Sequence, residues 1–478
     1  MMFTPVSAAT GRGRPGSLLP VLTCLAVAVL VGAAIPAYSL AMGESLSRLL
    51  VLPAALALLF LLIFNRLLLL TLILLFRASG DLVFETTRFA IGGYGIGVGG
   101  LVNAFVCLIA LLIVMQHKDR INWPGVRIWL PFVGVAAAGV LYAPAPGEAI
   151  RLALAIFSYF AVFMAAYFYV RSADDLGKCF RIVLWSSVIP VLYAVVDFAM
   201  NQGATGFYGF RLKSTFTHPN IFAFYLTLVI SVLLYAVKSE RFAVTPAMRN
   251  GLWIYMILLV GLLLMTKTRS AWVACFAVFV LYALLFERRY LIYLALAAVG
   301  ALFVPAVQER LLDLGAASPF DPYARLNSFA WRQLIWEDGL RWMEPVRYAF
   351  GYGVGAFMHY SPSFFSMSGG TQFGAHNVYV QLFFDLGLIG LAAYLALLGG
   401  LLRMARRVAA EDRLGAFVAS AVIVQYAIIS GSDNMLSYLA YNWYVWFIAG
   451  AAVAVVTRRA RPAGQEAARC REDSVVQR

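Results

Sequence analysis

Charged residues are scarce in this chain. Only 13% of its 478 residues are Asp, Glu, Lys or Arg, and 62% are hydrophobic, whereas soluble globular domains carry roughly 25% charged residues. This composition excludes a soluble globular protein. The apolar runs reach about 17 to 25 residues, long enough to cross a bilayer as helices, and the bilayer holds no water to satisfy the edges of strands. We therefore expect an all-α polytopic membrane protein.

Cysteine pairs and metal-binding patterns are also missing. The five cysteines lie mostly inside apolar runs, without paired spacing and without a neighbouring histidine that would complete a zinc set. We interpret them as small buried residues: Cys24, Cys107, Cys179, Cys275 and Cys470. The polar segments contain no clear Asp-x-Asp pair and no His/Asp set with metal-ligand spacing. The sequence therefore predicts neither a metal nor a cofactor.

Acidic residues are fewer than basic ones, 23 against 37, which gives a formal net charge of +14. The basic residues gather in alternate loops and in the C-terminal tail, as the positive-inside rule predicts for cytoplasmic segments. These segments are residues 118–127, 171–181, 238–250, 288–289, 403–413 and 458–478. We therefore expect cytoplasmic N- and C-termini, contact with membrane lipids and no nucleic-acid partner.

Fourteen apolar segments are candidate membrane spans. Arg77 and Asp81 interrupt the third, and twelve spans with two irregular segments remain an alternative. The N-terminal stretch lacks a small-residue cleavage pattern, so the first segment is expected to be a retained helix. The candidates are 18–41, 46–64, 67–84, 93–116, 126–143, 149–171, 178–200, 218–238, 250–266, 269–286, 290–306, 377–402, 414–431 and 435–457.

One long polar segment, residues 307–375, divides the chain. We expect an N-terminal transmembrane bundle (1–306), this large external loop, C-terminal transmembrane helices (376–457) and a basic cytoplasmic tail (458–478). Apolar residues within the loop recur at helical spacing and predict an amphipathic helix with indoles suited to the headgroup layer: Trp331, Leu334, Ile335 and Trp342. Such a helix serves either as a cap on the bundle or as a substrate lid.

Two external corners contain cations where the positive-inside rule predicts few. The first corner is RLKSTFTHPN (residues 211–220), with Arg211 and Lys213 before a helix that begins near Pro219. The second corner is TKTRSAWV (residues 266–273), with Lys267 and Arg269 between two apolar runs. Basic side chains at helix N-termini favour anions such as a diphosphate. Ordinary snorkelling cations at an interface, or contacts to phospholipid headgroups, are the alternatives.

A histidine opens the apolar run HNVYVQLFFDLGLIG, which begins with His376, Asn377 and Tyr379 on the same external side. Imidazole is the side chain whose ordinary pKa lies nearest neutrality, so His376 is a candidate general base for a hydroxyl. A structural helix cap is the alternative. Of the other histidines, His117 is expected on the cytoplasmic side, whereas His218 and His359 are external and secondary candidates.

These pieces together resemble the O-antigen ligase and Wzy-type polymerase superfamily of bacterial envelope glycosyltransferases. The resemblance spans residues 205–402. It rests on the order and sidedness of the Arg-containing corner ending in THPN, the TRSAW corner, a loop with NSFAWRQLIW and FGYGVGAF, and the run HNVYVQLFFDLGLIG. It implies a GT-C-like bundle of about 12 to 14 transmembrane helices with one large periplasmic loop, and inverting, metal-independent transfer of a glycan from undecaprenyl diphosphate on the periplasmic face of the bacterial inner membrane.

The same resemblance implies roles for individual residues. His376 would be the base on the acceptor hydroxyl, while Arg211 and Arg269 would hold the diphosphate with help from Lys213 and Lys267. Supporting residues are expected among the neighbouring polar groups: His218, Asn220, Arg332, Asn377 and Tyr379. One departure is Asp385, which stands where Glu is expected in the closing run.

Two activities fit the resemblance. A polymerase joins one lipid-linked glycan to another, and a ligase moves the glycan onto lipid A-core. Two spans beyond the twelve usual for ligases favour a polymerase of O-antigen or exopolysaccharide, with a chain-length regulator as a further implied partner. A transporter or lipid flippase is a distant alternative, because such proteins place ionisable groups near the bilayer midplane and show inverted repeats, whereas the cations here gather at one face.

Overall fold

The computed structural model describes residues 56–459 except 87, 92–93, 117–123, 171, 202–209, 243, 306 and 309–327. Residues 1–69 and 70–478 form two compact units. In the first unit the described residues are almost wholly helical, and the rings of Phe60 and Phe64 pack with 4.5 Å between their centroids. The elements that follow α3 belong to the second unit, which carries every candidate site residue.

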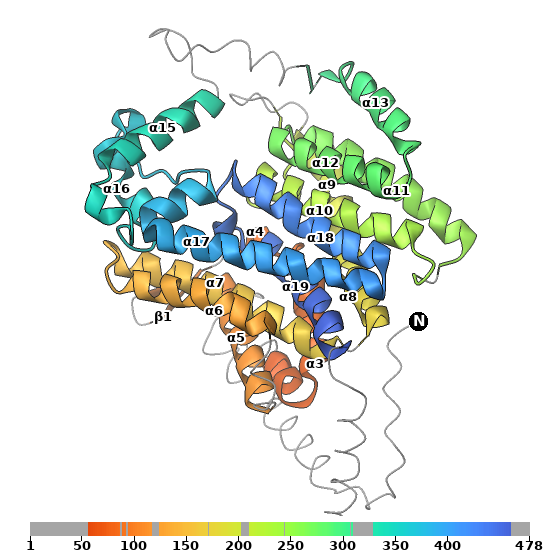
Figure 1. Ribbon diagram of the computed structural model, residues 1–478, viewed down its shortest axis with the longest axis horizontal. Helices are drawn as coiled ribbons and strands as arrows, with labels where there is room; N and C mark the ends of the chain where they lie inside the picture. Colours follow the sequence, from red (N-terminus) through yellow and green to blue (C-terminus); the bar gives the residue numbers. More distant parts are fainter. Residues whose placement is uncertain are drawn as a thin grey trace, which may run out of the picture. The chain divides into compact units, whose positions relative to one another are not determined.

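Helices dominate the described part of the chain, which confirms the predicted all-α class (Figure 1). They are α3 (Arg66–Arg77), α4 (Asp81–Thr86), α5 (Val98–Gln116), α6 (Pro124–Val140), α7 (Pro146–Tyr169), α8 (Ala173–Ser186), α9 (Val188–Asn201), α10 (Pro219–Lys238), α11 (Pro246–Met265), α12 (Arg269–Leu285), α13 (Tyr290–Ala301), α15 (Ser328–Trp342), α16 (Ala356–Phe364), α17 (Val378–Arg407), α18 (Arg413–Ser430) and α19 (Leu439–Arg459). The one exception is a small antiparallel hairpin of β1 (Arg88–Ile91) and β2 (Tyr94–Gly97), in which Arg88 pairs with Gly97.

Seven helices in the described residues are long and apolar enough to span a membrane, so the chain is a multi-pass membrane protein. They are Pro146–Tyr169, Ala173–Asn201, Pro219–Lys238, Pro246–Met265, Val378–Ala410, Arg413–Ser430 and Leu439–Thr457. Four shorter apolar helices are Val102–Met115, Pro124–Val140, Arg269–Leu285 and Tyr290–Ala301. These eleven coincide with the expected spans from 93–116 onwards. The expected span 18–41 lies outside the described residues, as does the first part of 46–64.

The expected third span, 67–84, is not one helix. It divides into α3 and α4 at residues 78–80, because Arg77 and Asp81 form a buried ion pair with a separation of 3.0 Å. The Arg77 guanidinium also lies over the rings of Phe84 and Trp443. An apolar run that contains a pair of charges therefore turns inside the protein instead of crossing the bilayer.

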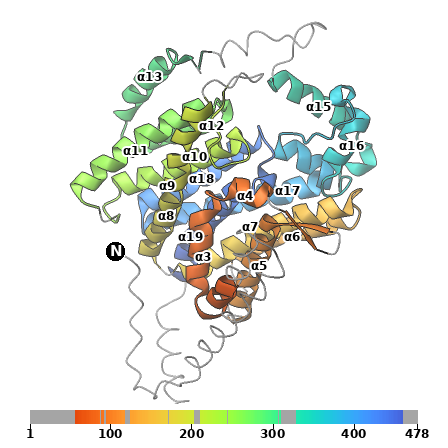
Figure 2. The same cartoon turned by 180° about the vertical axis from the view of Figure 1, so that it is seen from behind.

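The interior is built around α10 and α19. Residues 221–237 of α10 are all buried, and α19 packs against α7, α8, α17 and α18 (Figures 1 and 2). In contrast, α13 has no buried residue, and α11 exposes large apolar side chains such as Ile254 and Ile257. Exposed apolar helices are stable when hydrocarbon surrounds them. Cys179 and Cys275 are buried and Cys107 is half-buried, all three as free thiols, and Cys24 and Cys470 lie outside the described residues.

The FGYGVGAF motif is a wedge inserted into α17. This helix has a break at Gly387, where φ is +67° and ψ is −167°. The freed backbone groups pair with the inserted loop: the N–H of Leu388 donates to the Tyr348 carbonyl at 2.8 Å, and the N–H of Gly353 donates to the Asp385 carbonyl at 2.7 Å. Tyr348, just before the motif, and Gly353 within it thus pair with main-chain groups on the two sides of the break.

Asp385, the departure from the expected glutamate, holds the same wedge. Its Oδ1 accepts the Phe357 N–H at 2.7 Å and its Oδ2 accepts the Gly355 N–H at 2.9 Å. These donors lie at the N-terminus of α16, where a carboxylate is favoured by the helix dipole. The aspartate is therefore a cap for α16.

A helix forms over the predicted residues as α15, and part of its apolar surface packs on other protein segments. Ile335 is fully buried in a cluster with Phe357, Phe365 and Phe384 from α16, the loop that follows it and α17. Trp342 stacks on Phe384 with 5.9 Å between ring centroids. Protein rings thus cover part of the apolar surface of α15, and Trp342 remains 37% exposed.

We predict that Gly387→Ala destabilises the fold. Its φ and ψ belong to a region that only glycine occupies readily, at a cost of about 1–3 kcal/mol for other residues, and a Cβ there would meet main-chain atoms of Ala349 and Phe350. Thermal melting of the purified protein in detergent should show a clear drop. Gly399→Ala is the matched control, since Gly399 lies in the same helix with open space around its Cβ position. Equal melting temperatures of the two variants would contradict the wedge.

Candidate active site

Three separated segments meet at one end of the second unit. The first corner contacts the second through Arg211, whose Nε donates to the Thr266 carbonyl at 3.0 Å and whose Nη2 donates to Thr268 Oγ1 at 3.1 Å. The N–H of Leu212 adds a main-chain bond to the Met265 carbonyl. Two cation-bearing corners that are far apart in the sequence are thus joined, as their common sidedness predicts.

His376 is held by a buried carboxylate. Its Nδ1 lies 3.2 Å from Oδ1 of Asp433, a residue in the turn between α18 and α19 that is inaccessible to solvent. A carboxylate only accepts hydrogen bonds, so the shared proton belongs to Nδ1, and Nε2 is left as the nitrogen able to accept a proton. The imidazole keeps 36% of its side-chain surface exposed. A base with a fixed tautomer and an open face results.

Asn220 connects this carboxylate to the first corner. Its Nδ2 donates to Asp433 Oδ2 at 2.6 Å, and its Oδ1 accepts from Arg211 Nη2 at 2.7 Å and from Thr268 Oγ1 at 3.3 Å. One continuous chain of hydrogen bonds therefore runs from His376 through Asp433 and Asn220 to Arg211. The predicted base and a predicted anion-binding residue belong to the same network.

Charge compensation keeps Asp433 ionised although it is buried. Burial alone would raise the pKa of this carboxyl, but the hydrogen bond and charge of His376, the Tyr438 hydroxyl at 2.7 Å and the charge of Arg332 lower the pKa well below its ordinary value. Arg332 comes from α15, where the neighbouring Trp331 ring lies edge-on to the His376 ring with 6.0 Å between centroids. The loop helix thus adds a cation and an indole to the site.

The remaining predicted residues occupy less direct positions. His218 caps α10, because its Nδ1 accepts the Asn220 N–H at 3.1 Å. Asn377 caps α17 by accepting the N–H of Tyr379 at 2.9 Å, and the Tyr379 hydroxyl donates to the Ala427 carbonyl at 2.6 Å. His359 lies on α16 with its ring against Tyr360. His117 lies outside the described residues.

Two acidic residues that the sequence did not single out, Asp197 and Asp81, accept hydrogen bonds from the backbone of the first corner. Asp197 of α9 accepts the N–H groups of Lys213 and Ser214 at 3.1 and 2.8 Å, which fixes the backbone that carries the cations. Asp81 accepts the Thr217 N–H at 3.4 Å, and Thr215 donates to the Ala78 carbonyl at 2.9 Å. Residues at the break between α3 and α4 therefore contact the first corner directly.

Each of the three segments contains one strained residue. Among the described residues, the non-glycine positions with positive φ are Ser214 (54°), Lys267 (52°) and His376 (49°). Non-glycine residues in this region are uncommon and cost energy, so they persist where surrounding contacts enforce them, often at functional sites. Lys267 and Arg269 flank Thr268, the anchor of Arg211, at the start of α12. The three residues with positive φ therefore lie in the same three segments that the sequence singles out: the first corner, the second corner and the start of the run HNVYVQLFFDLGLIG.

Asp433 is the residue of this network that the sequence did not single out. It is the only acidic residue between positions 414 and 457, and an isolated carboxylate between two apolar spans is itself a functional signal. Nothing in the sequence reveals that it lies beside His376, because 57 residues separate the two.

We predict that Asp433→Asn destabilises the protein in a pH-dependent way. A carboxyl with a lowered folded-state pKa contributes stability that is fully present above its ordinary pKa of about 3.9 and is lost as the pH falls towards the lowered value. At neutral pH the variant should lose more than about 1.4 kcal/mol, the equivalent of one pKa unit. The gap in melting temperature from the wild type should narrow as the pH falls below about 3.9, because the unfolded chain then binds a proton that the folded, ionised Asp433 does not.

The control for this prediction is Asp174→Asn. Asp174 pairs with Arg241 at 3.4 Å, but its side chain is 76% exposed, and exposed ion pairs contribute about 0–1 kcal/mol. Asp174→Asn should have a melting temperature close to that of the wild type at every pH tested. A pH-independent deficit in Asp433→Asn would show that the aspartate carries no special charge interaction.

A comparison with known protein families found one match. Residues 254–395 match the family described as O-Antigen ligase, a segment that runs from α11 into α17. The match contains the second corner, Arg332 and His376, whereas the first corner and Asp433 lie outside it. No curated protein matches the chain. This chain is therefore a multi-pass membrane protein that carries an O-antigen ligase family domain over residues 254–395, a family of ligase- and polymerase-type glycan transfer.

Proposed function

We propose that the protein transfers a glycan from undecaprenyl diphosphate to a sugar hydroxyl on the periplasmic face of the bacterial inner membrane, with His376 as the general base. The observation that carries this proposal is the hydrogen-bonded chain from His376 through Asp433 and Asn220 to Arg211. The chain connects a proton acceptor to a cationic corner. Transfer from an activated lipid diphosphate requires both groups, one to deprotonate the acceptor hydroxyl and the other to compensate the charge of the leaving group.

In the proposed step, the acceptor hydroxyl gives its proton to Nε2 of His376 while its oxygen bonds to the anomeric carbon. The bond from that carbon to the diphosphate oxygen breaks on the opposite face, so the configuration inverts and undecaprenyl diphosphate leaves. Arg211 and Arg269, with Lys213 and Lys267, compensate the charge of the leaving group. No metal is needed for that task. Asp433 stabilises the imidazolium that forms, and the proton passes from Nε2 to water afterwards.

We propose polymerisation of polysaccharide repeat units as the reaction. The run 67–84 does not cross the bilayer as one helix. Thirteen of the fourteen expected spans therefore remain, one beyond the twelve usual for ligases, and this excess supports the choice. The second candidate is transfer to lipid A-core, which the family's description as O-Antigen ligase favours. The two reactions share the donor and the base and differ only in the acceptor.

The acceptor requirement is directly testable. Purified protein would be incubated with undecaprenyl-linked repeat units, with and without lipid A-core, and the products resolved by size. We expect a ladder of glycans without the core. Transfer that occurs only when the core is present would assign the protein as a ligase, and absence of transfer from any lipid-linked donor would overturn the glycosyltransferase assignment.

His376→Ala should lower the transfer rate by about 10²–10⁴-fold, the usual contribution of a positioned general base. Membrane insertion should be unchanged, because the side chain is partly exposed and the donors Asn220 and Tyr438 still hold the Asp433 carboxylate. His359→Ala is the matched control, as a second histidine of the same loop region, and should turn over within about twofold of the wild type. Wild-type turnover by His376→Ala would remove it from the role of base.

Arg211→Ala should weaken donor use much more than Arg211→Lys does. Lysine keeps the positive charge and loses the planar fork with which Arg211 reaches Thr266, Asn220 and Thr268. Initial rates over a range of donor concentrations give the two KM values. Equal losses in the two variants would mean that the geometry of the fork, and not the charge, sets donor affinity.

A further inference from the structure

The backbone that leads into His376 is held by two parts of the second unit. Ala375, the residue before the base, is inaccessible to solvent, and His376 itself has a φ of 49°. A left-handed conformation of this kind persists only where surrounding contacts enforce it. The contacts around these two residues therefore also decide where the imidazole points.

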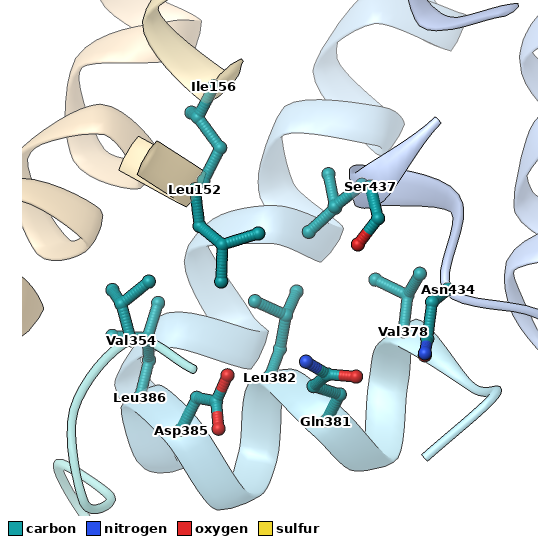
Figure 3. Close-up of a pocket in the computed structure, with 11 residues that line it drawn as sticks. Leu152, Ile156, Val354, Val378, Gln381, Leu382, Asp385, Leu386, Asn434 and Ser437 are labelled. Carbon is teal, nitrogen blue, oxygen red and sulfur yellow. The ribbon is translucent and has the colours of Figure 1, made fainter. Parts of the chain in front are cut away.

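The first part is the turn between α18 and α19. Its Asp433 bonds to His376 Nδ1, and its Asn434 lies so close to Gly374 that a Cβ on this glycine would meet the Asn434 amide nitrogen. Figure 3 shows Asn434 beside Val378, the first residue of α17. The turn thus contacts both the imidazole and the chain that precedes it.

The second part is the loop helix α15. The Nε1–H of Trp336 donates to the Ala375 carbonyl at 2.5 Å, and the Trp331 ring lies edge-on to the His376 ring with 6.0 Å between centroids. Helix α15 is itself anchored, because Ile335 is fully buried in the loop's hydrophobic cluster. The helix therefore contacts both the main chain before the base and the ring of the base.

The bond from Trp336 fixes the orientation of one peptide plane. The carbonyl of Ala375 and the N–H of His376 belong to a single planar unit, and φ of His376 describes rotation about the bond between that unit and the His376 Cα. Among the described residues, Trp336 is the only hydrogen-bond donor to this carbonyl. Without the indole, a buried acceptor loses its partner, which is costly, and the peptide unit loses the bond that orients it.

We propose that Trp336 is a positioning residue for the base, and that its hydrogen bond to the Ala375 carbonyl directs Nε2 of His376 towards the acceptor hydroxyl. The inference rests on the proposed function, which supplies the role of His376. It deepens that function by giving the large loop a task in the chemistry, because α15 then holds the base in position as well as covering it. In this role Trp336 acts through His376 and handles no proton itself.

A tryptophan with a purely structural role predicts a different result. If the bond only stabilised the loop, its loss would lower the melting temperature and leave the turnover of the folded enzyme unchanged. If the bond directs the base, turnover falls even at temperatures where the protein is fully folded, because small displacements of a reacting group slow a reaction strongly. The affinity for the lipid-linked glycan should not change, since no cation is moved.

Trp336→Phe keeps an aromatic ring and removes the N–H. With undecaprenyl-linked repeat units as substrate, we expect kcat to fall about tenfold and KM to stay within about twofold of the wild type. Trp342→Phe is the matched control, because the same change on the same helix removes an N–H that bonds to no described residue. The control should keep the wild-type kcat. An unchanged kcat in Trp336→Phe, or an equal fall in the two variants, would overturn the proposal.

An isosteric change serves if Trp336→Phe does not fold. Benzothienylalanine at position 336 replaces the indole N–H with sulfur and keeps the shape of the ring, so it deletes the hydrogen bond without leaving a cavity. We again expect kcat to fall about tenfold with little change in KM. Wild-type turnover by this protein would contradict the positioning role.

A measurement without turnover separates this proposal from the glycosyltransferase assignment. The chain has four histidines, so nitrogen-15 labelling of histidine gives a simple NMR spectrum, in which His376 is identified by its loss in His376→Ala. At alkaline pH the wild type should show the Nδ1–H tautomer at His376, which the bond to Asp433 selects. Trp336→Phe should show a mixture of tautomers, and Trp342→Phe should show the wild-type signal.

The two proposals fail in different ways. A changed His376 signal in Trp336→Phe alone supports the positioning role even if no glycan transfer is found. A His376 signal equal to that of the wild type overturns the positioning role, and the glycosyltransferase assignment is then judged by wild-type turnover alone.

Discussion

The carboxylate of Asp433 is fully buried, and a buried charge is stable only when compensated by hydrogen bonds and opposite charge. That requirement fixes the site. His376 from the start of α17, Asn220 from the first turn of α10 and Tyr438 from the turn before α19 all converge on its two oxygens. Withdrawing one of them leaves the charge undercompensated, so the ends of three helices hold one relative position.

The cationic corner is likewise held in place by hydrogen bonds to neighbouring polar groups. Arg211 keeps its orientation through Asn220, Thr266 and Thr268, and the backbone beside it is clamped by Asp197. These contacts enforce left-handed conformations at Ser214, Lys267 and His376 that isolated segments would avoid. The strain is therefore a consequence of a site whose geometry is set before any substrate arrives, and such preorganisation is what stabilises developing charge efficiently.

Much of this arrangement follows from the sequence, and the rest does not for definite reasons. Apolar runs predict the spans because the bilayer dictates their length. The sequence also singles out the two cationic corners, and Arg211 of the first contacts Thr266 and Thr268 of the second. The roles of Asp433 and Asp385 depend on contacts across many residues, which local patterns do not encode. The run 67–84 was misread as a span because a buried ion pair, Arg77 with Asp81, makes charges tolerable inside a protein fold. The stacking of Trp342 on Phe384 is likewise a contact between segments distant in the sequence, which helical spacing does not predict.

The division of charge around Asp433 gives the site a direction. On one side Asn220 and Arg211 lead to a corner with several cations, and on the other the side chain of His376 keeps 36% of its surface exposed. Cations favour an anionic group on the first side, whereas the nitrogen able to accept a proton lies on the second. Both sides are bonded to the two oxygens of one buried carboxylate, so Asp433 sets the distance between the cations and the proton acceptor.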